Sequence, residues 1–310
     1  MTSVVRPPGG GLPLRHPADV EPKKRDIWAE WLAHYRFGGD AAERERMLEQ
    51  TSVFRKRVLE GAALARGETL LDVGCGEGLI GFGAFERGAG HVIFSDISDD
   101  LIDFCRETAE SLDLVERCSF VKAAADDLAG VANESVDVVT TRSVLIYVAD
   151  KARAFDEFMR VLRPGGRVSL FEPINSFEMD EKGDGFWGYP AEGVADLAAR
   201  VTAVFEEIQA PTDPMLDFDE RDLFGLAQAA GFFPVELDYK AEVRPSDVVA
   251  WDTFVNTSGN PLIPTIGEAI DRALALDERE RLIEHLRPLV EQGRGVWRMA
   301  QAYLVAVKPS

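Results

Sequence analysis

The stretch that decides the fold runs Leu70-Leu71-Asp72-Val73-Gly74-Cys75-Gly76-Glu77-Gly78, an apolar run that enters a glycine-rich turn. A helix is expected to begin directly after it, at about Leu79. Glycines let a backbone turn tightly and approach a ligand closely. The first turn of the helix then offers unpaired N–H groups to an acceptor. The stretch alone is also compatible with a plain tight turn between a strand and a helix, so a second signal is needed.

The spacing of the glycines separates two classes of ligand. Turns that bind dinucleotides follow G-x-G-x-x-G, whereas this turn follows G-x-G-x-G and has Leu79 where that pattern places its last glycine. Asp72 precedes the first glycine by two residues. A carboxylate there disfavours a pyrophosphate but would attract the ammonium group of a bound methionine moiety. The spacing therefore argues against a nicotinamide-dependent oxidoreductase.

The second signal is Asp96, at the end of the next strand-like run and 18 residues after Gly78. An acid at this strand end can accept hydrogen bonds from both hydroxyls of a ribose. Ile97 and Leu101 could then pack on an adenine face. Asp96 alone could equally be the N-cap of a helix over 99–113. Found together and in this order, the turn and the acid favour a nucleoside site.

Strand-like and helix-like segments alternate from residue 68 to 175. Such alternation predicts an α/β fold with a parallel sheet that is covered on both faces. The expected strands are Thr69–Val73, His91–Ser95, Ser119–Lys122, Val136–Thr141 and Arg167–Glu172, with helices near 79–87, 99–113 and 150–162.

Four stretches, Leu70–Gly78, Val92–Ser98, Val136–Val148 and Glu157–Pro173, match in order those of a known family. The chain resembles the class I S-adenosylmethionine (SAM) methyltransferases, especially the small-molecule branch that includes the quinone-ring C-methyltransferases. The resemblance covers roughly residues 60–175 and a helix at 219–230. It implies a Rossmann-like sheet and SAM as the cofactor, and says little about the acceptor.

The rest of the chain is expected to cover this sheet. An amphipathic stripe predicts a helix over 191–209, Asp219 is a plausible N-cap for 219–230, and Asp277 with Glu280 has the spacing of a capping box. The resulting division is a flexible tail (1–24), an N-terminal helical cover (25–60), the SAM-binding core (61–174), a cap insertion (175–217), a core helix and strand (218–245), a helical cap insertion (246–296) and a final core strand (297–310).

The resemblance implies roles for the residues around the turn. Asp72 and Gly74 would hold the methionine part of SAM, Cys75 and Gly76 would line the turn, and Asp96 would bind the ribose. The turn Arg163-Pro164-Gly165-Gly166 is expected to connect a helix to a strand rather than to take part in the chemistry.

The resemblance also implies roles for two later loops. Relatives often carry an acid at the position of Ala124, so the N–H of Ala125 and the carboxylate of Asp126 would meet the adenine edge instead. Thr141 and Arg142 would lie near the methionine carboxylate or the acceptor. Asp126 could alternatively be a solvated loop acid, and Arg142 a member of a structural ion pair.

Catalysis requires little acid–base chemistry because SAM carries an activated sulfonium leaving group. The protein need only align a nucleophile with the methyl group and exclude water, and a base helps when the nucleophile carries a proton. Candidates at the open end of the sheet are Glu172, Tyr147 and Arg142, and Tyr35 and His34 could reach in from the cover. Each has a structural alternative: Glu172 could orient a loop, Tyr147 could pack in the core, and His34 could lie on a helix surface.

The acceptor must be inferred from the cap. The cap holds the aromatic residues Phe177, Phe186, Trp187, Tyr189, Trp251 and Phe254. Apolar pockets with few polar groups suit small organic molecules. We therefore expect C-, N- or O-methylation of a small aromatic or lipophilic acceptor, in the setting of specialised metabolism. The alternatives are that these aromatics only pack the cap onto the sheet, or that the chain is a non-catalytic SAM-binding sensor or partner subunit.

Composition opposes several other functions. The 310 residues carry a net charge of −20, from 54 acidic and 34 basic side chains. This balance opposes binding to nucleic acid and to an anionic membrane surface. No Asn-Pro-Pro-Tyr type signature follows the fourth strand, and only Asn260-Pro261-Leu262 resembles it faintly, in the wrong place. An arsenite-type methyltransferase needs a set of thiols, whereas Cys75 belongs to the turn and Cys105 to a helix.

The remaining expectations concern metal and compartment. No His/Asp cluster has the spacing of metal ligands. The third cysteine is Cys118, and three irregularly spaced cysteines indicate reduced thiols in a cytoplasmic protein. The N-terminus has no apolar segment of a signal peptide, and no run approaches the ~20 apolar residues of a membrane helix. A monomer and a homodimer both remain open.

Overall fold

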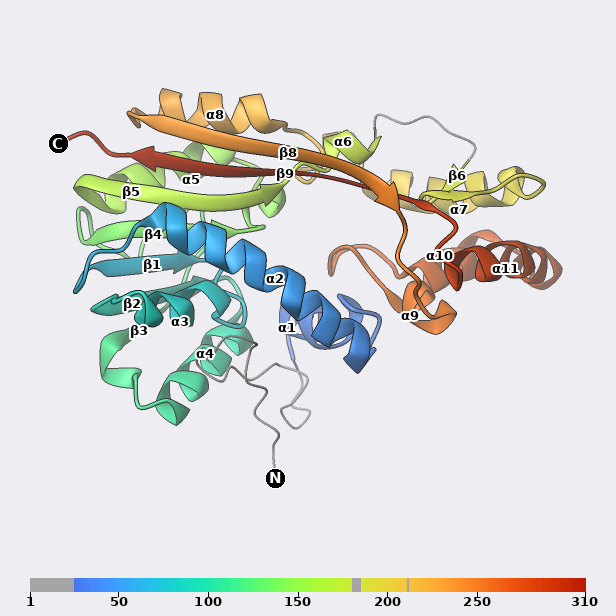
Figure 1. The fold of residues 1–310 in the computed structure, drawn as a ribbon, viewed down its shortest axis with the longest axis horizontal. Helices are drawn as coiled ribbons and strands as arrows, with labels where there is room; N and C mark the ends of the chain where they lie inside the picture. Colours follow the sequence, from blue (N-terminus) through green and yellow to red (C-terminus); the bar gives the residue numbers. More distant parts are fainter. Residues whose placement is uncertain (1–24, 180–184, 211) are drawn as a thin grey trace.

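The computed structural model describes residues 25–179, 185–210 and 212–310, so the predicted tail lies outside the described residues. Its centre is a seven-stranded sheet with the order β3-β2-β1-β4-β5-β9-β8 (Figure 1). Five strands are mutually parallel, β9 is antiparallel to both of its neighbours, and β8 forms one edge. The strands are β1 Thr69–Val73, β2 His91–Asp96, β3 Cys118–Lys122, β4 Val136–Arg142, β5 Leu162–Pro173, β8 Val235–Pro245 and β9 Val296–Val307.

The strand order reverses between β1 and β4, and this reversal places the site. Val73, the last residue of β1, pairs with Ser95 of β2 on one side and with Thr141 of β4 on the other. The carboxyl ends of the three strands therefore meet at one edge of the sheet. In open α/β sheets ligands bind at such a switch point.

Helices cover both faces of the sheet, as the alternation predicts. Leu70 packs with α2, α3 and α4 on one face, whereas Leu71 packs with α5 and α8 on the other, because successive side chains of a strand point to opposite faces. These helices are α2 Ala41–Ala62, α3 Leu79–Glu86, α4 Asp99–Ser111, α5 Lys151–Val161 and α8 Glu220–Ala229, with short helical turns η3 Val115–Arg117 and η4 Leu145–Tyr147.

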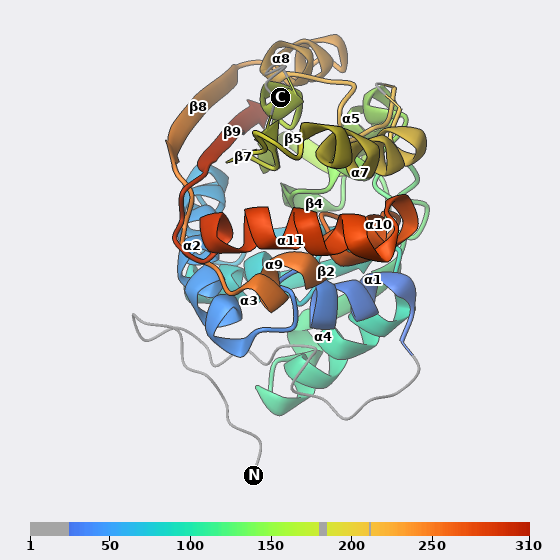
Figure 2. The same cartoon turned by 90° about the vertical axis from the view of Figure 1, so that its right-hand side faces the viewer.

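Further helices lie beyond the carboxyl ends of the parallel strands. Figure 2 looks onto this end, where α11, α9 and α1 lie in front of the sheet. Most of these elements share an apolar core of their own, which includes Leu197, Trp251 and Leu286. The elements outside the central sheet and its covering helices are α1 Ile27–Glu30, η2 Trp31–Tyr35, α6 Ser176–Met179, β6 Gly185–Phe186, β7 Tyr189–Pro190, α7 Ala195–Ile208, α9 Trp251–Asn256, α10 Ile266–Ala273 and α11 Leu276–Val290.

Helix ends test the capping predictions. The Asp219 side chain accepts hydrogen bonds from the backbone N–H groups of Arg221 and Asp222, so the predicted N-cap is confirmed. The capping box predicted from Asp277 and Glu280 is wrong. Helix α11 begins at Leu276, and the Glu278 carboxylate instead accepts a hydrogen bond from the N–H of the preceding Ala275, at 2.9 Å.

Two backbone details differ from the expected pattern. The first helix changes into a π-helical turn at Trp31–Tyr35, a geometry that is frequent at functional sites. The Arg163-Pro164-Gly165-Gly166 turn falls within β5 instead of before it. Val136 pairs with Leu162 and Val138 with Arg167, so the four residues between them bulge out of the ladder.

Candidate cofactor and acceptor site

The glycine turn occupies the switch point and needs glycine for steric reasons. Gly74 has φ +62°, and a Cβ there would lie 2.4 Å from a methyl group of Val144. Gly78 has φ +80°, and a Cβ there would lie 2.5 Å from the ring of Phe82. Both the left-handed backbone and the close neighbours exclude larger residues. The turn is therefore packed tightly between α3 and the loop that follows β4.

Asp72 supports the turn from within the core. Thr140 donates to one carboxylate oxygen at 2.9 Å, and the N–H of Gly81 donates to the other at 2.8 Å. The side chain is buried, and burial raises its pKa to about 7. Both oxygens are thus engaged by the protein, which is the arrangement of a residue that positions the turn. Contact between Asp72 and the ammonium group of a ligand stays a prediction.

Asp96 ties the end of β2 to the turn. Its carboxylate accepts hydrogen bonds from the N–H of Gly76 at 2.9 Å and from the N–H of Ser98 at 3.0 Å. Burial raises the pKa of this carboxyl group. The alternative that Asp96 caps the following helix is wrong, because Ser98 is the N-cap and accepts from the N–H of Leu101.

The residues predicted to frame an adenine differ in exposure. Ile97 is 45% exposed, whereas Leu101 is 3% exposed and packs with Trp31 and Leu32 of the cover. Ala125 is buried in the core of the sheet, and Asp126 is half-buried in the same loop. The turn, Asp96 and this loop thus lie beside one another at the carboxyl edge, since the N–H of the adjacent Ala123 donates to the carbonyl of Asp96 at 3.0 Å.

Arg142 is the last residue of β4, and its guanidinium has no directly bonded partner among the described residues. Among the described residues it makes neither a hydrogen bond nor an ion pair, so the structural ion pair considered from sequence is absent there. Burial and, after it, the nearby charge of Arg36 lower its pKa to about 10, although Glu77 and Asp72 act in the opposite direction. The side chain stays charged at neutral pH.

Glu77, the fourth residue of the glycine turn, complements Arg142. One of its carboxylate oxygens is buried and has no hydrogen-bond partner in the described part of the chain. The Glu77 oxygen can accept a hydrogen bond from a ligand, and the Arg142 guanidinium can donate one. Such a pair suits a zwitterion, which is the form of the methionine moiety of SAM. Neither Glu77 nor Arg36 was predicted as a site residue from the sequence. Their positions could have suggested it, since Glu77 lies inside the glycine turn and Arg36 lies in the aromatic turn after the first helix.

Glu172 at the end of β5 organises the loop after β4. Its carboxylate accepts hydrogen bonds from the N–H groups of Val144 at 3.0 Å, Leu145 at 3.1 Å and Ile146 at 3.3 Å, and from the Thr141 hydroxyl at 3.3 Å. The side chain is fully buried, and burial raises its pKa to about 7. The structure therefore places Glu172 where it orients this loop, and Thr141 is one of its partners.

The two tyrosine candidates differ in their surroundings. Tyr147 packs edge-to-face on Trp28 with ring centroids 5.1 Å apart, and burial raises its pKa to about 12. Tyr35 is 41% exposed at the end of the π-helical turn. His34 lies on the surface, 3.1 Å from Arg25. The structure does not bring Tyr35 together with Tyr147 in any hydrogen bond.

The cover bridges the sheet and the cap. The hydroxyl of Ser98 donates to the Asp26 carboxylate at 2.6 Å. On the other side, the Trp31 indole donates to the carbonyl of Ser258 at 2.9 Å, and the N–H of Ser258 donates to the carbonyl of Tyr35 at 3.1 Å. Because the segment of α1 and η2 contacts both the sheet and the cap, it can exclude water from the carboxyl ends of the strands.

The cysteines do not form a reactive centre. The sulfurs of Cys75 and Cys105 lie 3.9 Å apart and are buried, and burial raises the pKa of both thiols. Burial also raises the pKa of Cys118 to about 12. In the part of the chain that the structure describes, no group of three or more His, Cys, Asp or Glu side chains could hold a metal ion.

Two hollows on the surface are separate from this site. One, of about 330 Å³, lies between α2 and the β8–β9 pair, and the other, of about 380 Å³, lies beside α6 and β8. Neither is lined by the glycine turn, Asp96 or Arg142.

No helix among the described residues is both long and apolar enough to cross a membrane.

Comparison with known proteins identifies the core. Residues 71–170 match the family described as "Methyltransferase domain". The chain also superposes on the YcgJ protein of Bacillus subtilis with a TM-score of 0.52 and 16% sequence identity, over 84% of this chain and 99% of that one. The predicted Rossmann-like fold is confirmed.

The curated relatives differ in what they act on. An arsenite methyltransferase of Halobacterium salinarum is 38% identical over 169 residues, which cover 51% of this chain and 42% of that protein. A tRNA 5-carboxymethoxyuridine methyltransferase of Escherichia coli is 37% identical over 33% of this chain and 38% of that protein. The match thus spans less than half of these two relatives. The ubiquinone/menaquinone biosynthesis C-methyltransferase UbiE of Klebsiella pneumoniae is 27% identical over 67% of this chain and 85% of that protein.

Proposed function

We propose that the chain transfers a methyl group from SAM to a small organic acceptor, which the match of residues 71–170 to the family described as "Methyltransferase domain" supports. The observation that carries the proposal is the unmatched pair of Glu77 and Arg142 beside the glycine turn. A methionine moiety satisfies both, because its ammonium group suits the carboxylate and its carboxylate suits the guanidinium. When bound, SAM supplies a methyl group already activated by the sulfonium.

The described residues have separate tasks in this proposal. Asp96 accepts hydrogen bonds from the ribose hydroxyls, as acids at this strand end do. Arg142 and Arg36 hold the methionine carboxylate, which also relieves the repulsion between the two guanidinium groups. Ile97 and the loop of Ala125 and Asp126 frame the adenine.

The chain contributes to the transfer by positioning rather than by proton abstraction. Glu172 holds the loop 143–146 through three backbone N–H groups. Tyr147, with a pKa of about 12, is rarely ionised at neutral pH and is a poor base. The cover then excludes water from the strand ends, which strengthens the electrostatic interactions there. An acceptor that is already nucleophilic, such as an amine, a phenolate or an activated ring carbon, suits this site.

Charge, rather than the cap, indicates the class of acceptor, because the cap aromatics pack against one another in the core of the cap, as the structural alternative expected. Tyr189 and Phe254 contact edge-to-face at 5.6 Å, and Trp251 lies 5.7 Å from Phe254. The arginines of the site face the methionine end, and the net charge of −20 repels a polyanion. We therefore favour a small aromatic or lipophilic acceptor over tRNA. Arsenite is disfavoured, because the close thiols of Cys75 and Cys105 are buried.

The test is production of S-adenosylhomocysteine from SAM in the presence of four acceptor sets: aromatic amines and phenols, quinols, arsenite with a thiol, and bulk tRNA. The proposal predicts turnover with an organic acceptor and none with tRNA. Turnover only with tRNA or with arsenite would overturn the assignment of the acceptor. Tight SAM binding without turnover on an extended organic panel would favour a non-catalytic SAM-binding protein.

A further inference from the structure

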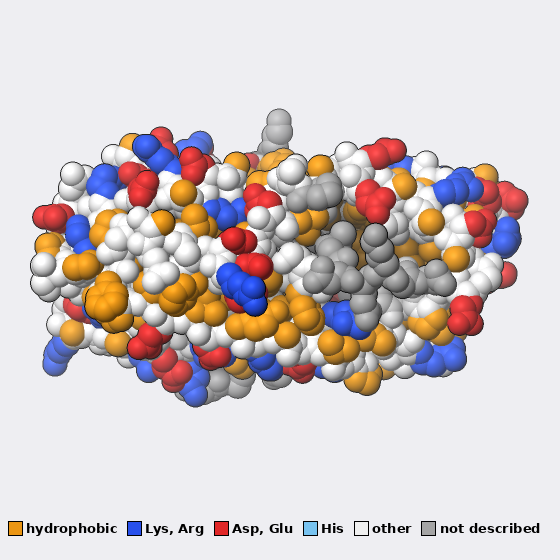
Figure 3. Space-filling view, turned by 90° about the horizontal axis from the view of Figure 1, so that it is seen from above, with side chains coloured by type: hydrophobic (Ala, Val, Ile, Leu, Met, Phe, Trp, Pro, Cys, Tyr) orange, Lys and Arg blue, Asp and Glu red, His pale blue; other side chains and the backbone are white. Residues whose placement is uncertain are grey.

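Strand β8 is a long free edge of the sheet. It has 11 residues, and among the described residues it pairs only with β9. Exposed hydrophobic side chains lie on it and beside it, including Tyr239 (36%), Val243 (52%) and Phe233 (76%). Figure 3 looks down on this side of the molecule and shows hydrophobic side chains in a broken band between charged ones. Proteins usually blunt or cover such an edge, because its unpaired backbone groups can recruit another strand.

The charges on β8 alternate along one face. Every second residue is charged, in the order Glu236, Asp238, Lys240, Glu242 and Arg244. The residues between them are apolar or aromatic. A second copy of the same strand can add to this edge in antiparallel orientation, and a two-fold axis normal to the sheet then keeps the charged faces together.

The pattern selects one register for such a pair. With the axis at Ala241, Asp238 lies opposite Arg244 of the second copy and Lys240 lies opposite its Glu242, so all four charged cross-strand pairs are attractive. A shift of the axis to Lys240 sets lysine against lysine, and a shift to Glu242 sets glutamate against glutamate. Like charges directly opposite each other destabilise a sheet. Tyr239 lies opposite Val243 in the favoured register, which covers both exposed side chains.

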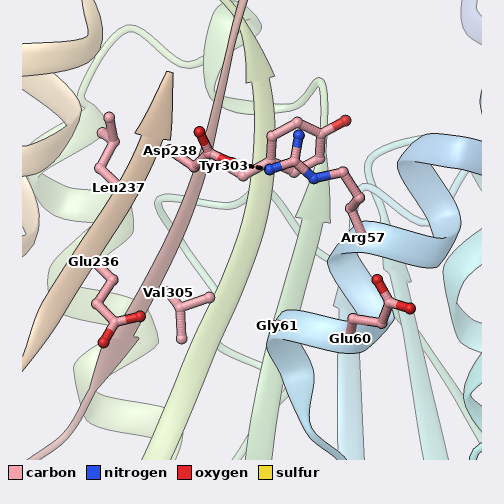
Figure 4. A pocket seen from close by; sticks show the side chains of 8 residues that line it. All are labelled: Arg57, Glu60, Gly61, Glu236, Leu237, Asp238, Tyr303 and Val305. Atoms are coloured by element: carbon pink, nitrogen blue, oxygen red, sulfur yellow. Dashed lines mark hydrogen bonds and ion pairs between the residues drawn. The ribbon is translucent and has the colours of Figure 1, made fainter. Parts of the chain in front are cut away.

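The hollow next to β8 supplies further complementarity. Figure 4 shows Arg57 over the ring of Tyr303, 3.7 Å from its centroid, and paired with Asp238. Glu60 and Glu236 line the same hollow, so three acids face one arginine there. Arg244 of the second copy would arrive opposite Asp238 and bring a second positive charge to this acidic hollow. Within one chain, the pairs of Asp238 with Arg57 and of Lys240 with Glu242 are largely solvent-exposed, so they can be exchanged at little cost. Arg244 donates two hydrogen bonds of 3.0 Å to Asp247 in a half-buried pair, and it must release Asp247 when it pairs with Asp238 of the second copy.

We propose that the chain forms a two-fold homodimer through β8–β8 pairing centred on Ala241, which joins two seven-stranded sheets into one. The proposal is independent of the cofactor and of the acceptor. Its first consequence is a solution mass of twice the 34.1 kDa of one chain. Sedimentation equilibrium of the full chain at micromolar concentration and low salt measures this mass directly. A monomer under these conditions would overturn the proposal.

Charge-reversal variants test the register. Asp238→Arg and Arg244→Asp each place like charges opposite each other, so each alone is expected to weaken dimerisation at least tenfold. Mixed in equal amounts, the two variants restore both attractive pairs and form a mixed dimer. Asp271→Arg on the cap and Arg221→Asp on α8, which change the charge equally at exposed sites, should leave the dimer intact. A mixture that associates no better than the single variants would contradict the register.

A cross-link gives a measurement that does not depend on affinity. Opposite residues of antiparallel strands have Cα atoms about 4.5–5.5 Å apart, within the range of a disulfide. Ala241→Cys, at an exposed position, should therefore give a covalent dimer with diamide. Leu276→Cys, also exposed, and the unaltered chain should not. Equal cross-linking of both variants would indicate random collision and would count against the proposal.

Discussion

The carboxylate of Glu172 on β5 accepts a hydrogen bond from the backbone N–H of Val144, the first of three consecutive N–H groups that it holds, at 3.0 Å. Val144 in turn packs against Gly74, since a Cβ on that glycine would lie 2.4 Å from it. One buried acid thus fixes the loop after β4, and that loop fixes the glycine turn. The candidate site depends on this chain of contacts as much as on the residues that would touch SAM.

The pKa of Glu172 gives a prediction about stability and pH. Burial raises that pKa to about 7 in the folded chain, from an ordinary value of 4.5. The contribution of Glu172 to stability is therefore complete below about pH 4.5 and is lost as the pH rises to about 7. Relative to Glu172→Gln, the unaltered chain should lose on the order of 2–3 kcal/mol of unfolding free energy between pH 4.5 and 7.5.

Urea unfolding of both proteins at several pH values measures this difference, and the parallel shift of Asp72 cancels in the comparison. A difference that does not change with pH would mean that the three N–H groups outweigh burial and keep Glu172 ionised.

The glycine turn gives a prediction with a matched control. Gly78 and Gly193 have almost the same φ, +80° and +81°, but a Cβ would meet the Phe82 ring at the first position and nothing within 4 Å at the second. Gly193→Ala should cost about 1–2 kcal/mol, from backbone strain alone. Gly78→Ala should cost at least about 1 kcal/mol more, because of the added overlap. Thermal unfolding of both variants measures the difference, and equal costs would show that the turn is looser than the structure indicates.

Arg142 should have opposite effects on stability and on binding. Its guanidinium is half-buried and makes no hydrogen bond or ion pair with the described residues, so Arg142→Gln should leave the free protein as stable or stabilise it by about 1 kcal/mol. The same change should weaken SAM binding by about tenfold or more, since a charged hydrogen bond is lost. Arg106→Gln, an exposed arginine paired with Asp103 on α4, should change neither. Unchanged SAM affinity in Arg142→Gln would remove Arg142 from the cofactor site.

Tyr147 should matter for its ring and not for its hydroxyl. Because its pKa is about 12, Tyr147→Phe is expected to change the turnover rate by less than about threefold between pH 7 and 9. Tyr147→Ala should reduce turnover much more, because it removes the contact with Trp28. A large loss in Tyr147→Phe, with a rate in the unaltered enzyme that rises with pH, would identify Tyr147 as a base.

Sequence patterns located the sheet, the turn and Asp96, because glycine spacing and strand–helix alternation are local signals. They could not show that Thr140 and Gly81 engage Asp72, since these contacts join segments far apart in the chain. The capping box at Asp277 failed for a related reason. The sequence allows the helix to begin either at Asp277, with Glu280 three residues on, or at Ala275, with Glu278 three residues on. The structure has the second arrangement.

The unmatched charges of Glu77 and Arg142 could not be recognised from sequence either. Whether a charged side chain has a partner depends on which distant segments the fold brings near it. The sequence around Arg142 would be the same if that arginine were paired. The acceptor could not be predicted from the sequence, because the same aromatic residues would suit a binding pocket or, as the structure has it, the core of the cap.

The most direct test of the central claim is calorimetry of the purified chain with SAM, S-adenosylhomocysteine and NAD, beside the variant Asp96→Ala. The account predicts micromolar binding of the first two ligands, no binding of NAD, and loss of binding in the variant while the variant remains folded by circular dichroism. No binding of SAM, or a preference for NAD, would contradict the assignment of the glycine turn as a SAM site.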